Sequence, residues 1–265
     1  MGDRPDLTKP TTMDTGILTN VLKNHAGQFH PVVPFEPGQD RLYPFDFTVA
    51  NADLTSEMVA DTELFASWIE ARLQETGAKY GIGGYAEHRT LYARSDYFGT
   101  AGQTATHGEG LMAEEPRRLH LGIDIWAPAG TKIMSPLDGL VHSFAFNNND
   151  SDYGATMIVT HNIDGTPFHT LFGHLSLNSL KNLHEGKRIR RGEVIGEMGM
   201  RFENGNWPPH LHFQLIADME GYKGDYPGVC KFSEKERWLA NCPDPDLVLD
   251  MLQYCDPHDA DLISG

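Results

Sequence analysis

Histidines and a carboxylate occur in the chain with spacings that suit a metal ion. The run His120-Leu121-Gly122-Ile123-Asp124 places an imidazole and a carboxylate close together, and Gly122 is expected to let the chain curl so that both face one ion. Zinc takes nitrogen and oxygen donors of this kind at roughly 2.0 to 2.2 Å. By itself the pair is a weak signal, because a chain with 13 histidines is expected to contain such a match fairly often.

The second arrangement is His210-Leu211-His212, which lies within an apolar run. On a strand, side chains at positions i and i+2 emerge on the same face, so the two imidazoles would stand side by side. One of them can bind an ion while its neighbour reaches a substrate or a water molecule. The alternative is a pair of hydrogen-bonded histidines in the core, because buried imidazole nitrogens need partners.

A third candidate, His174, ends the strand-like segment 168–176 and is predicted to lie at the rim of the same cleft. With Asp124 and two histidines as ligands, one coordination position stays open for water, which is typical of a catalytic rather than a structural zinc site. The three arrangements together favour a metal site over either alternative.

Other catalytic motifs are absent from the sequence. The dipeptide His184-Glu185 lacks the second histidine of an H-E-x-x-H site, and no nucleophile elbow or phosphate-binding G-K-[ST] loop occurs. Three cysteines, Cys230, Cys242 and Cys255, form no C-x-x-C pair, so reduced thiols are expected instead of a thiolate zinc site.

Charge and hydrophobicity limit the partners of the chain. A net charge of -16 over 265 residues disfavours nucleic acids and anionic membranes as partners. No apolar run is long enough to span a bilayer. Residues 1–27 do not read as a secretory signal, so a cytoplasmic location is expected. A periplasmic or extracellular location is the alternative if a leader has been removed.

The elements that must position these residues are mainly short strands. From about residue 116, strand-like segments alternate with glycine-rich turns at 133–134, 139–144, 156–161, 169–174, 194–198 and 210–216. This pattern predicts a mainly β fold, an antiparallel β-sandwich or barrel. It is preceded by an α/loop extension with one amphipathic helix, which has the acidic residues Asp61 and Glu63 in front and Gly77 behind, and it is followed by C-terminal helices.

Two segments of the extension bear on the site. Residues 81–86 are rich in glycine but lack the strand-turn-helix context of a dinucleotide-binding fingerprint. The segment from Tyr85 to Phe98 combines charged and aromatic residues. A solvated loop is the simple interpretation of this segment, and we predict instead that it covers one side of the active-site groove.

At this point the chain resembles the lysostaphin-type zinc metalloendopeptidases, which are peptidoglycan endopeptidases. The motifs that carry the resemblance are 118–125, 127–131, 135–139, 153–161, 170–176, 191–196 and 209–213. The resemblance implies a duplicated hybrid motif domain over 116–220, between the extension at 1–115 and a helical tail at 221–265. It also implies one zinc ion per chain, held by His120, Asp124 and His212, with His174 and His210 acting on the zinc-bound water and the tetrahedral intermediate.

The resemblance implies hydrolysis of peptide bonds in peptidoglycan or other short peptides that contain glycine or D-amino acids. Two alternatives stay open: a metal-dependent hydrolase of a cytosolic amide, and a non-catalytic regulator that binds a partner in the groove. In this chain Trp207-Pro208-Pro209 replaces the usual small residues before the H-x-H strand, so a bulkier groove wall is expected. Gln214 stands where the family often has an acidic residue.

Overall fold

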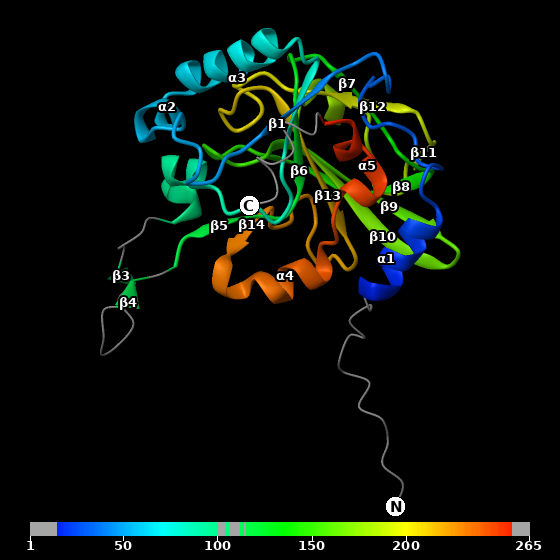
Figure 1. Ribbon diagram of the computed structural model, residues 1–265. Helices are drawn as coiled ribbons and strands as arrows, with labels where there is room; N and C mark the ends of the chain where they lie inside the picture. Colours follow the sequence, from blue (N-terminus) through cyan, green and yellow to red (C-terminus); the bar gives the residue numbers. More distant parts are fainter. Residues whose placement is uncertain (1–14, 100–103, 106–111, 114, 256–265) are drawn as a thin grey trace, which may run out of the picture.

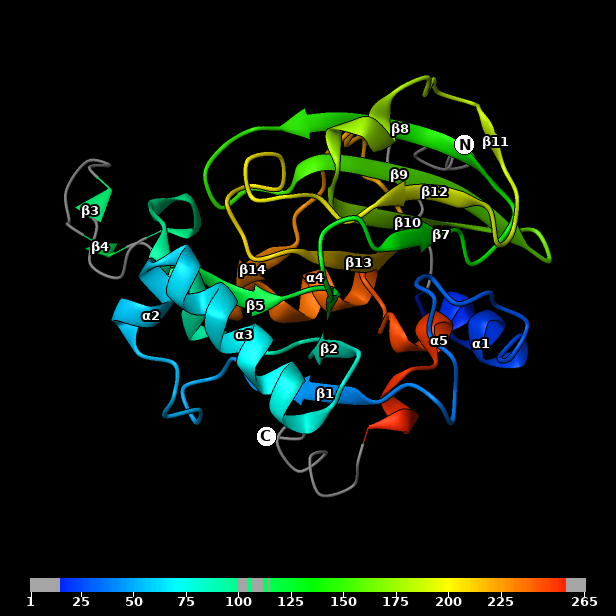
Figure 2. The same ribbon diagram turned by 90° about the horizontal axis from the view of Figure 1, so that it is seen from above.

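An eight-stranded sheet forms the centre of the protein in this computed structural model (Figure 1). The structure describes residues 15–99, 104–105, 112–113 and 115–255. In spatial order the strands are β1 (Leu42–Phe45), β2 (Tyr80–Gly83), β6 (Ile123–Trp126), β13 (His210–Ile216), β10 (Thr166–Leu175), β9 (Gly154–Ile163), β8 (Gly139–Asn147) and β11 (Arg188–Ile189). Figure 2 shows β8 and β1 on opposite sides of the molecule, with β10 and β13 between them.

The predicted mainly β fold is confirmed. All six segments predicted as strands overlap strands of the structure. From β6 to β11 every neighbouring pair is antiparallel, whereas β1 and β2 of the extension pair in parallel and make the whole sheet mixed. Three two-stranded sheets complete the described strands: β7 (Lys132–Met134) with β12 (Val194–Glu197), β5 (Arg117–His120) with β14 (Val229–Lys231), and β3 (Thr104–Ala105) with β4 (Met112–Ala113).

Strand β13 separates the main core from the candidate site. Leu211, Phe213 and Leu215 point into the main hydrophobic core, which also contains residues of β7, β12 and α1 (Thr15–Asn24). The alternate residues His210 and His212 therefore share the opposite face, as the two-residue period of a strand requires. All seven residues of β13 are buried, so the polar face of the strand lies inside the protein too.

Helices cover both sides of the sheet. They are α1, α2 (Ser56–Ala60), α3 (Thr62–Thr76), α4 (Lys235–Asn241) and α5 (Asp246–Leu249), with 3-10 turns η1 (Thr90–Arg94), η2 (Asp96–Phe98), η3 (Leu177–Leu180), η4 (Phe232–Glu234) and η5 (Leu252–Tyr254). Trp238 of α4 packs in a second core with Leu119 and Ile216. Within the described ranges, no helix combines the length and apolarity that a membrane span needs.

The helix predicted in the extension is α3. The Asp61 side chain accepts hydrogen bonds from the first backbone N–H groups, and Gly77 ends the helix in the left-handed conformation with a φ of 65°. The extension also forms α1 and α2, which the sequence analysis did not expect. Isolated helix propensity is low in α1, because it is rich in β-branched residues, and burial of Leu18 and Leu22 stabilises it. The division of the chain at residues 115 and 220 stays a prediction.

Candidate metal centre

Three neighbouring strands of the main sheet, together with β5 of a two-stranded sheet, bring the five predicted site residues together. His120 ends β5, Asp124 lies on β6, His174 lies on β10, and His210 and His212 lie on β13. In the register of the sheet, His212 stands directly opposite Asp124. All five side chains belong to residues that are at most 5% exposed.

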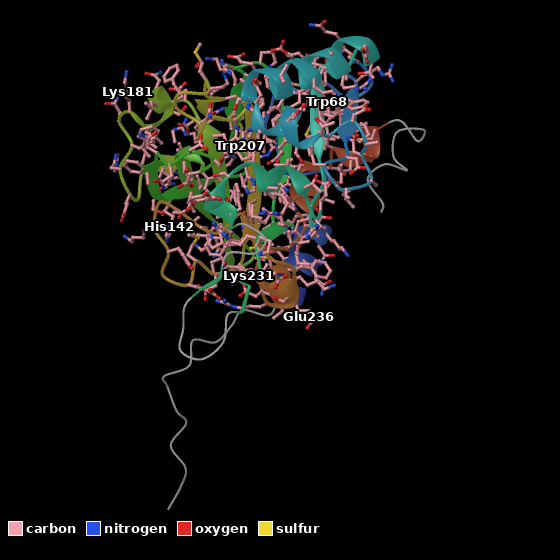
Figure 3. All side chains as sticks on the ribbon, turned by 90° about the vertical axis from the view of Figure 1, so that its left-hand side faces the viewer. Trp68, His142, Lys181, Trp207, Lys231 and Glu236 are labelled. Atoms are coloured by element: carbon pink, nitrogen blue, oxygen red, sulfur yellow. The ribbon has the colours of Figure 1, made fainter. Side chains whose placement is uncertain are left out.

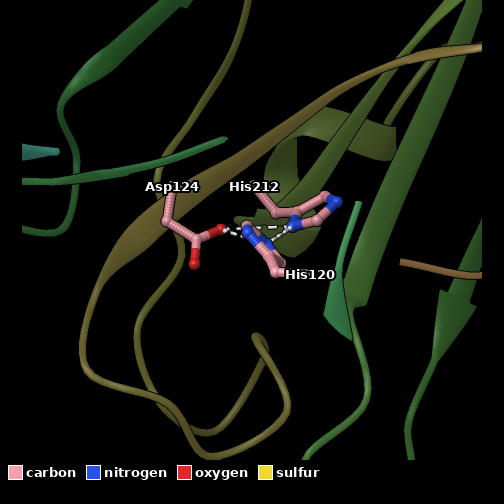
Figure 4. Close-up of side chains that lie close together, drawn as sticks. All are labelled: His120, Asp124 and His212. Carbon is pink, nitrogen blue, oxygen red and sulfur yellow. Dashed lines mark hydrogen bonds and ion pairs between the residues drawn. The ribbon is translucent and has the colours of Figure 1, made fainter. Parts of the chain in front are cut away.

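Three of these residues converge on one point (Figure 4). Nε2 of His120 lies 2.9 Å from Nδ1 of His212, and Oδ1 of Asp124 lies 3.3 Å and 3.1 Å from these two nitrogens. Two imidazole nitrogens and one carboxylate oxygen are the donors that zinc takes in catalytic sites with an open position. The triad thus has the composition and spacing of a mononuclear metal site.

Hydrogen bonds behind the two ligand histidines determine which nitrogen carries the proton. Nδ1 of His120 donates to the carbonyl oxygen of Gly84 at 3.0 Å, which leaves a lone pair on Nε2. Nε2 of His212 donates to Oε1 of Gln214 at 2.9 Å, which leaves a lone pair on Nδ1. Gln214 is oriented for this by its own amide group, which donates to Pro227 O at 3.1 Å. Two facing lone pairs and a carboxylate repel one another, and a cation between them relieves that repulsion.

The charges of the site favour the same arrangement. Burial, together with the positive charge of Arg89, lowers the pKa of His120 to about 3. Burial opposes ionisation of Asp124, but His120 and the Arg89 guanidinium outweigh it and hold the pKa of this carboxyl well below its usual range. The imidazole of His120 is therefore neutral and the carboxyl group ionised at neutral pH, as metal ligands must be.

His174 and His210 lie beside the triad with their ring centroids 4.1 Å apart. Nδ1 of His174 donates to Asn204 O, and Nδ1 of His210 donates to Pro208 O, both at 2.8 Å. In both rings Nε2 is then the acceptor nitrogen. Burial lowers the pKa of His210 to about 4 and that of His174 well below its ordinary value, so both rings are neutral at pH 7.

The backbone at His174 explains how its ring reaches the triad. His174 has a φ of 61°, in the left-handed region that favours glycine, and it lies at an irregularity in the pairing of β10 with β9. Two backbone hydrogen bonds hold this conformation: the N–H of His174 donates to Tyr153 O, and the carbonyl oxygen of His174 accepts from the N–H of Gly199. Strained residues of this kind gather at functional sites.

Gly122 has a different role from the one expected. Its φ is not positive, so the chain does not need a glycine there in order to curl. A Cβ at this position would lie 2.6 Å from Cε1 and Nε2 of His212. The glycine therefore provides space for the His212 ring.

Arg89 is a site residue that the sequence analysis did not single out. It lies in the extension and is 1% exposed, and its Nη1 donates to Oδ2 of Asp124. Its Nε pairs with Oε2 of Glu87 at 2.5 Å. The available signal was the combination of charged and aromatic residues in the segment around it.

A cleft of about 650 Å³, including its open mouth, lies over the triad. The residues of the extension that line it are Arg89, Leu91, Tyr92, Tyr97 and Phe98. This confirms the prediction that the segment from Tyr85 to Phe98 covers one side of the groove. Trp207 is a further wall residue, as the bulkier loop before β13 predicted, and Figure 3 shows it near the middle of one face of the molecule, below α3.

Comparisons with known proteins place these residues in context. A sequence model described as Peptidase family M23 matches residues 118–223. The DD-carboxypeptidase/endopeptidase Mpg of Neisseria meningitidis is 36% identical over 97 residues, which are 37% of this chain and 20% of that protein. The L-Ala--D-Glu endopeptidase of Bacillus subtilis is 32% identical over 107 residues, covering 38% of this chain and 31% of that protein. The chain therefore spans between a fifth and a third of the length of these relatives.

Solved structures of similar proteins include the catalytic domain of lysostaphin from Staphylococcus simulans. The two chains are 19% identical, and the superposition covers 57% of this chain and 98% of the lysostaphin domain with a TM-score of 0.33. A zinc-containing peptidase from Vibrio cholerae is 24% identical, covers 42% of this chain and 30% of that chain, and has a TM-score of 0.30.

Proposed function

We propose that the chain is a zinc-dependent endopeptidase that hydrolyses short peptides of the peptidoglycan type, on the premise that residues 118–223, which match peptidase family M23, form a domain of that family. The observation that carries the proposal is the pair of lone-pair nitrogens, His120 Nε2 and His212 Nδ1, facing one carboxylate oxygen of Asp124. These three residues would hold the ion. Bound there, zinc lowers the pKa of a water molecule, polarises the scissile carbonyl and stabilises the oxyanion that develops on it.

His210 and His174 would move the protons. Nε2 of His210 lies 4.0 Å from Oδ1 of Asp124, within reach of a water molecule beside the triad. Because Nδ1 of each ring already donates to a backbone carbonyl, Nε2 accepts the proton that leaves the attacking water. The imidazolium then donates that proton to the leaving amine nitrogen. While neutral, neither ring can donate to an oxyanion, so any such role for His174 requires that it first gains a proton.

The substrate class rests on the relatives and on the shape of the cleft. The names of the two relatives specify DD-carboxypeptidase or endopeptidase activity and an L-Ala--D-Glu bond. Aromatic side chains, among them Tyr92, Tyr97 and Trp207, line the cleft, and its volume of about 650 Å³, mouth included, is of the size that binds a small ligand such as a short peptide.

Zinc analysis combined with muropeptide digestion tests this proposal. We expect one zinc per chain in the wild type and cleavage of purified muropeptides, detected by mass spectrometry as fragments separated at a peptide bond. Asp124→Ala is expected to lose both zinc and activity, whereas His210→Ala is expected to keep zinc and lose activity. If the zinc-loaded protein cleaves only small amides, the peptidoglycan-type substrate is wrong and the alternative of an amide hydrolase is favoured. If the zinc-loaded protein cleaves neither muropeptides nor small amides, the alternative of a non-catalytic regulator is favoured.

A further inference from the structure

We propose that Arg89 is a positioning residue for the metal ligand Asp124, supplied to the site by the extension. This inference rests on the proposed metal site and adds a part outside residues 118–223. Arg89 binds Oδ2 of Asp124, while Oδ1 faces the two ligand histidines. The guanidinium thereby leaves Oδ1 of Asp124 available to the ion and keeps Oδ2 in its own hydrogen bond.

The orientation of the guanidinium is fixed from every side. Nε is paired with Glu87 Oε2 at 2.5 Å, and Nη2 donates to Gly84 O at 3.3 Å. Glu87 is held in turn, because its Oε1 accepts a hydrogen bond from the backbone N–H of Phe47 at 3.1 Å. The guanidinium carbon lies 5.1 Å from the centre of the Phe47 ring. A planar group held at three edges and one face can place Asp124 with little freedom.

Burial makes a purely structural role a poor explanation for these charges. The side chains of Arg89, Glu87 and Asp124 are 1%, 8% and 4% exposed. Removing charges from water is costly, and replacing a buried ion pair by apolar residues is often neutral or stabilising.

The backbone around Arg89 provides space for it and connects it to the other ligand. A Cβ on Gly83 would lie 2.7 Å from Nη2 of Arg89, so this glycine allows the guanidinium to enter. The following segment pairs with β5 through hydrogen bonds from His120 N to Glu87 O and from Arg89 N to Arg118 O, each 2.9 Å. The carbonyl oxygen of Gly84 also holds the ring of His120. Residues 83–89 therefore support two of the three metal ligands.

The pairing determines how many positions at the metal stay open. A carboxylate with both oxygens free can take up two coordination positions, whereas one whose Oδ2 is bound to Arg89 offers only Oδ1. An ion held by Oδ1 of Asp124 and the two histidines would have three protein ligands, the number found in catalytic zinc sites that keep a further position for water or substrate. Arg89 would thus act on the metal through Asp124.

Zinc affinity measured by chelator competition tests this role in the double variant E87Q/R89M. The variant removes both members of the Glu87–Arg89 pair, so neither is left buried without the other, while the hydrogen bond from Arg89 to Asp124 is lost. We expect the Kd for zinc to rise roughly 10- to 100-fold, as for other residues that orient metal ligands. R89K keeps the charge but not the planar fork, and a smaller rise is expected.

Two further measurements separate positioning from a general loss of stability. The visible absorption spectrum of the cobalt(II)-loaded protein reports coordination number, and we expect it to change in E87Q/R89M and in R89K. The control is R118M, which removes another buried guanidinium, one whose hydrogen bonds to described residues go to Arg117 O and Gly99 O. R118M is expected to keep the zinc Kd and the cobalt spectrum of the wild type.

Wild-type zinc affinity and cobalt spectra in both E87Q/R89M and R89K would overturn the inference and leave the proposed function intact. If the double variant does not fold, R89K decides in the same two measurements. A wild-type protein that binds no zinc would overturn the proposed function and this inference together.

Discussion

Gly122→Ala is a small change for which the structure predicts a large effect on the metal site. The added Cβ would lie 2.6 Å from Cε1 and Nε2 of His212 and 2.8 Å from the carbonyl oxygen of Phe213. An ordinary contact begins near 3.4 Å, so the His212 ring would have to move by about 0.8 Å, the difference between 3.4 and 2.6 Å. The alternative is a shift of the Gly122 backbone, which would carry His120 and Asp124 with it.

Either movement exceeds what a zinc site tolerates, because ligand distances vary by only about 0.2 Å. We therefore expect the zinc Kd of Gly122→Ala to rise at least about tenfold, measured by chelator competition. Overpacking should also lower the free energy of unfolding of the metal-free protein by about 1–3 kcal/mol, measured by urea denaturation.

Gly139→Ala is the matched control. A Cβ at Gly139 on β8 would lie 2.6 Å from Thr160 O and 2.8 Å from Nδ1 of His161, a comparable clash with a histidine ring. In sheet order β8 is three strands from β13. This variant should lose a similar amount of stability and keep the zinc affinity of the wild type. Equal zinc affinity in Gly122→Ala and the wild type would refute the spatial role of Gly122.

Three more predictions follow from the site and the core. Gln214→Met removes the acceptor behind Nε2 of His212, so the zinc Kd should rise roughly 10- to 100-fold; an unchanged Kd would contradict this role of Gln214. His210→Ala should lower kcat by roughly 10²- to 10⁴-fold with zinc still bound, because it removes the proton acceptor; a change in KM alone would contradict that assignment. Burial lowers the pKa of His161 from 6.5 to about 4, so the unfolded chain binds its proton first and stability falls as pH drops through this window. The urea midpoint should decrease between pH 6.5 and 4, and less in His161→Gln; equal slopes would exclude His161 as the cause.

Much of the site follows from local spacing. The two-residue period of β13 places His210 and His212 on one face whatever the rest of the fold does. The His120 to Asp124 spacing is equally local, since only Leu121 and Gly122, with a bend at Gly122, separate β5 from β6. The sequence therefore predicted the mainly β fold, and it predicted residues that the structure brings together.

Other parts depend on tertiary contacts that spacing does not reveal. Arg89 meets Asp124 across 35 positions of sequence, and a charged residue in an aromatic and polar segment normally lies at the surface. His174 reaches the cleft because its backbone has a positive φ, a conformation that a histidine in the sequence does not predict. Helix α1 forms although its own helix propensity is low, because Leu18 and Leu22 are buried in the main core against strands that are distant in the sequence.

The most direct test of the metal site is an anomalous-scattering map of zinc-loaded crystals, measured at the zinc absorption edge. We predict one peak at roughly 2.0 to 2.2 Å from Nε2 of His120, Oδ1 of Asp124 and Nδ1 of His212, with a fourth position open toward the cleft. A map with no peak among these three residues, or with zinc bound only elsewhere on the protein, would contradict the account.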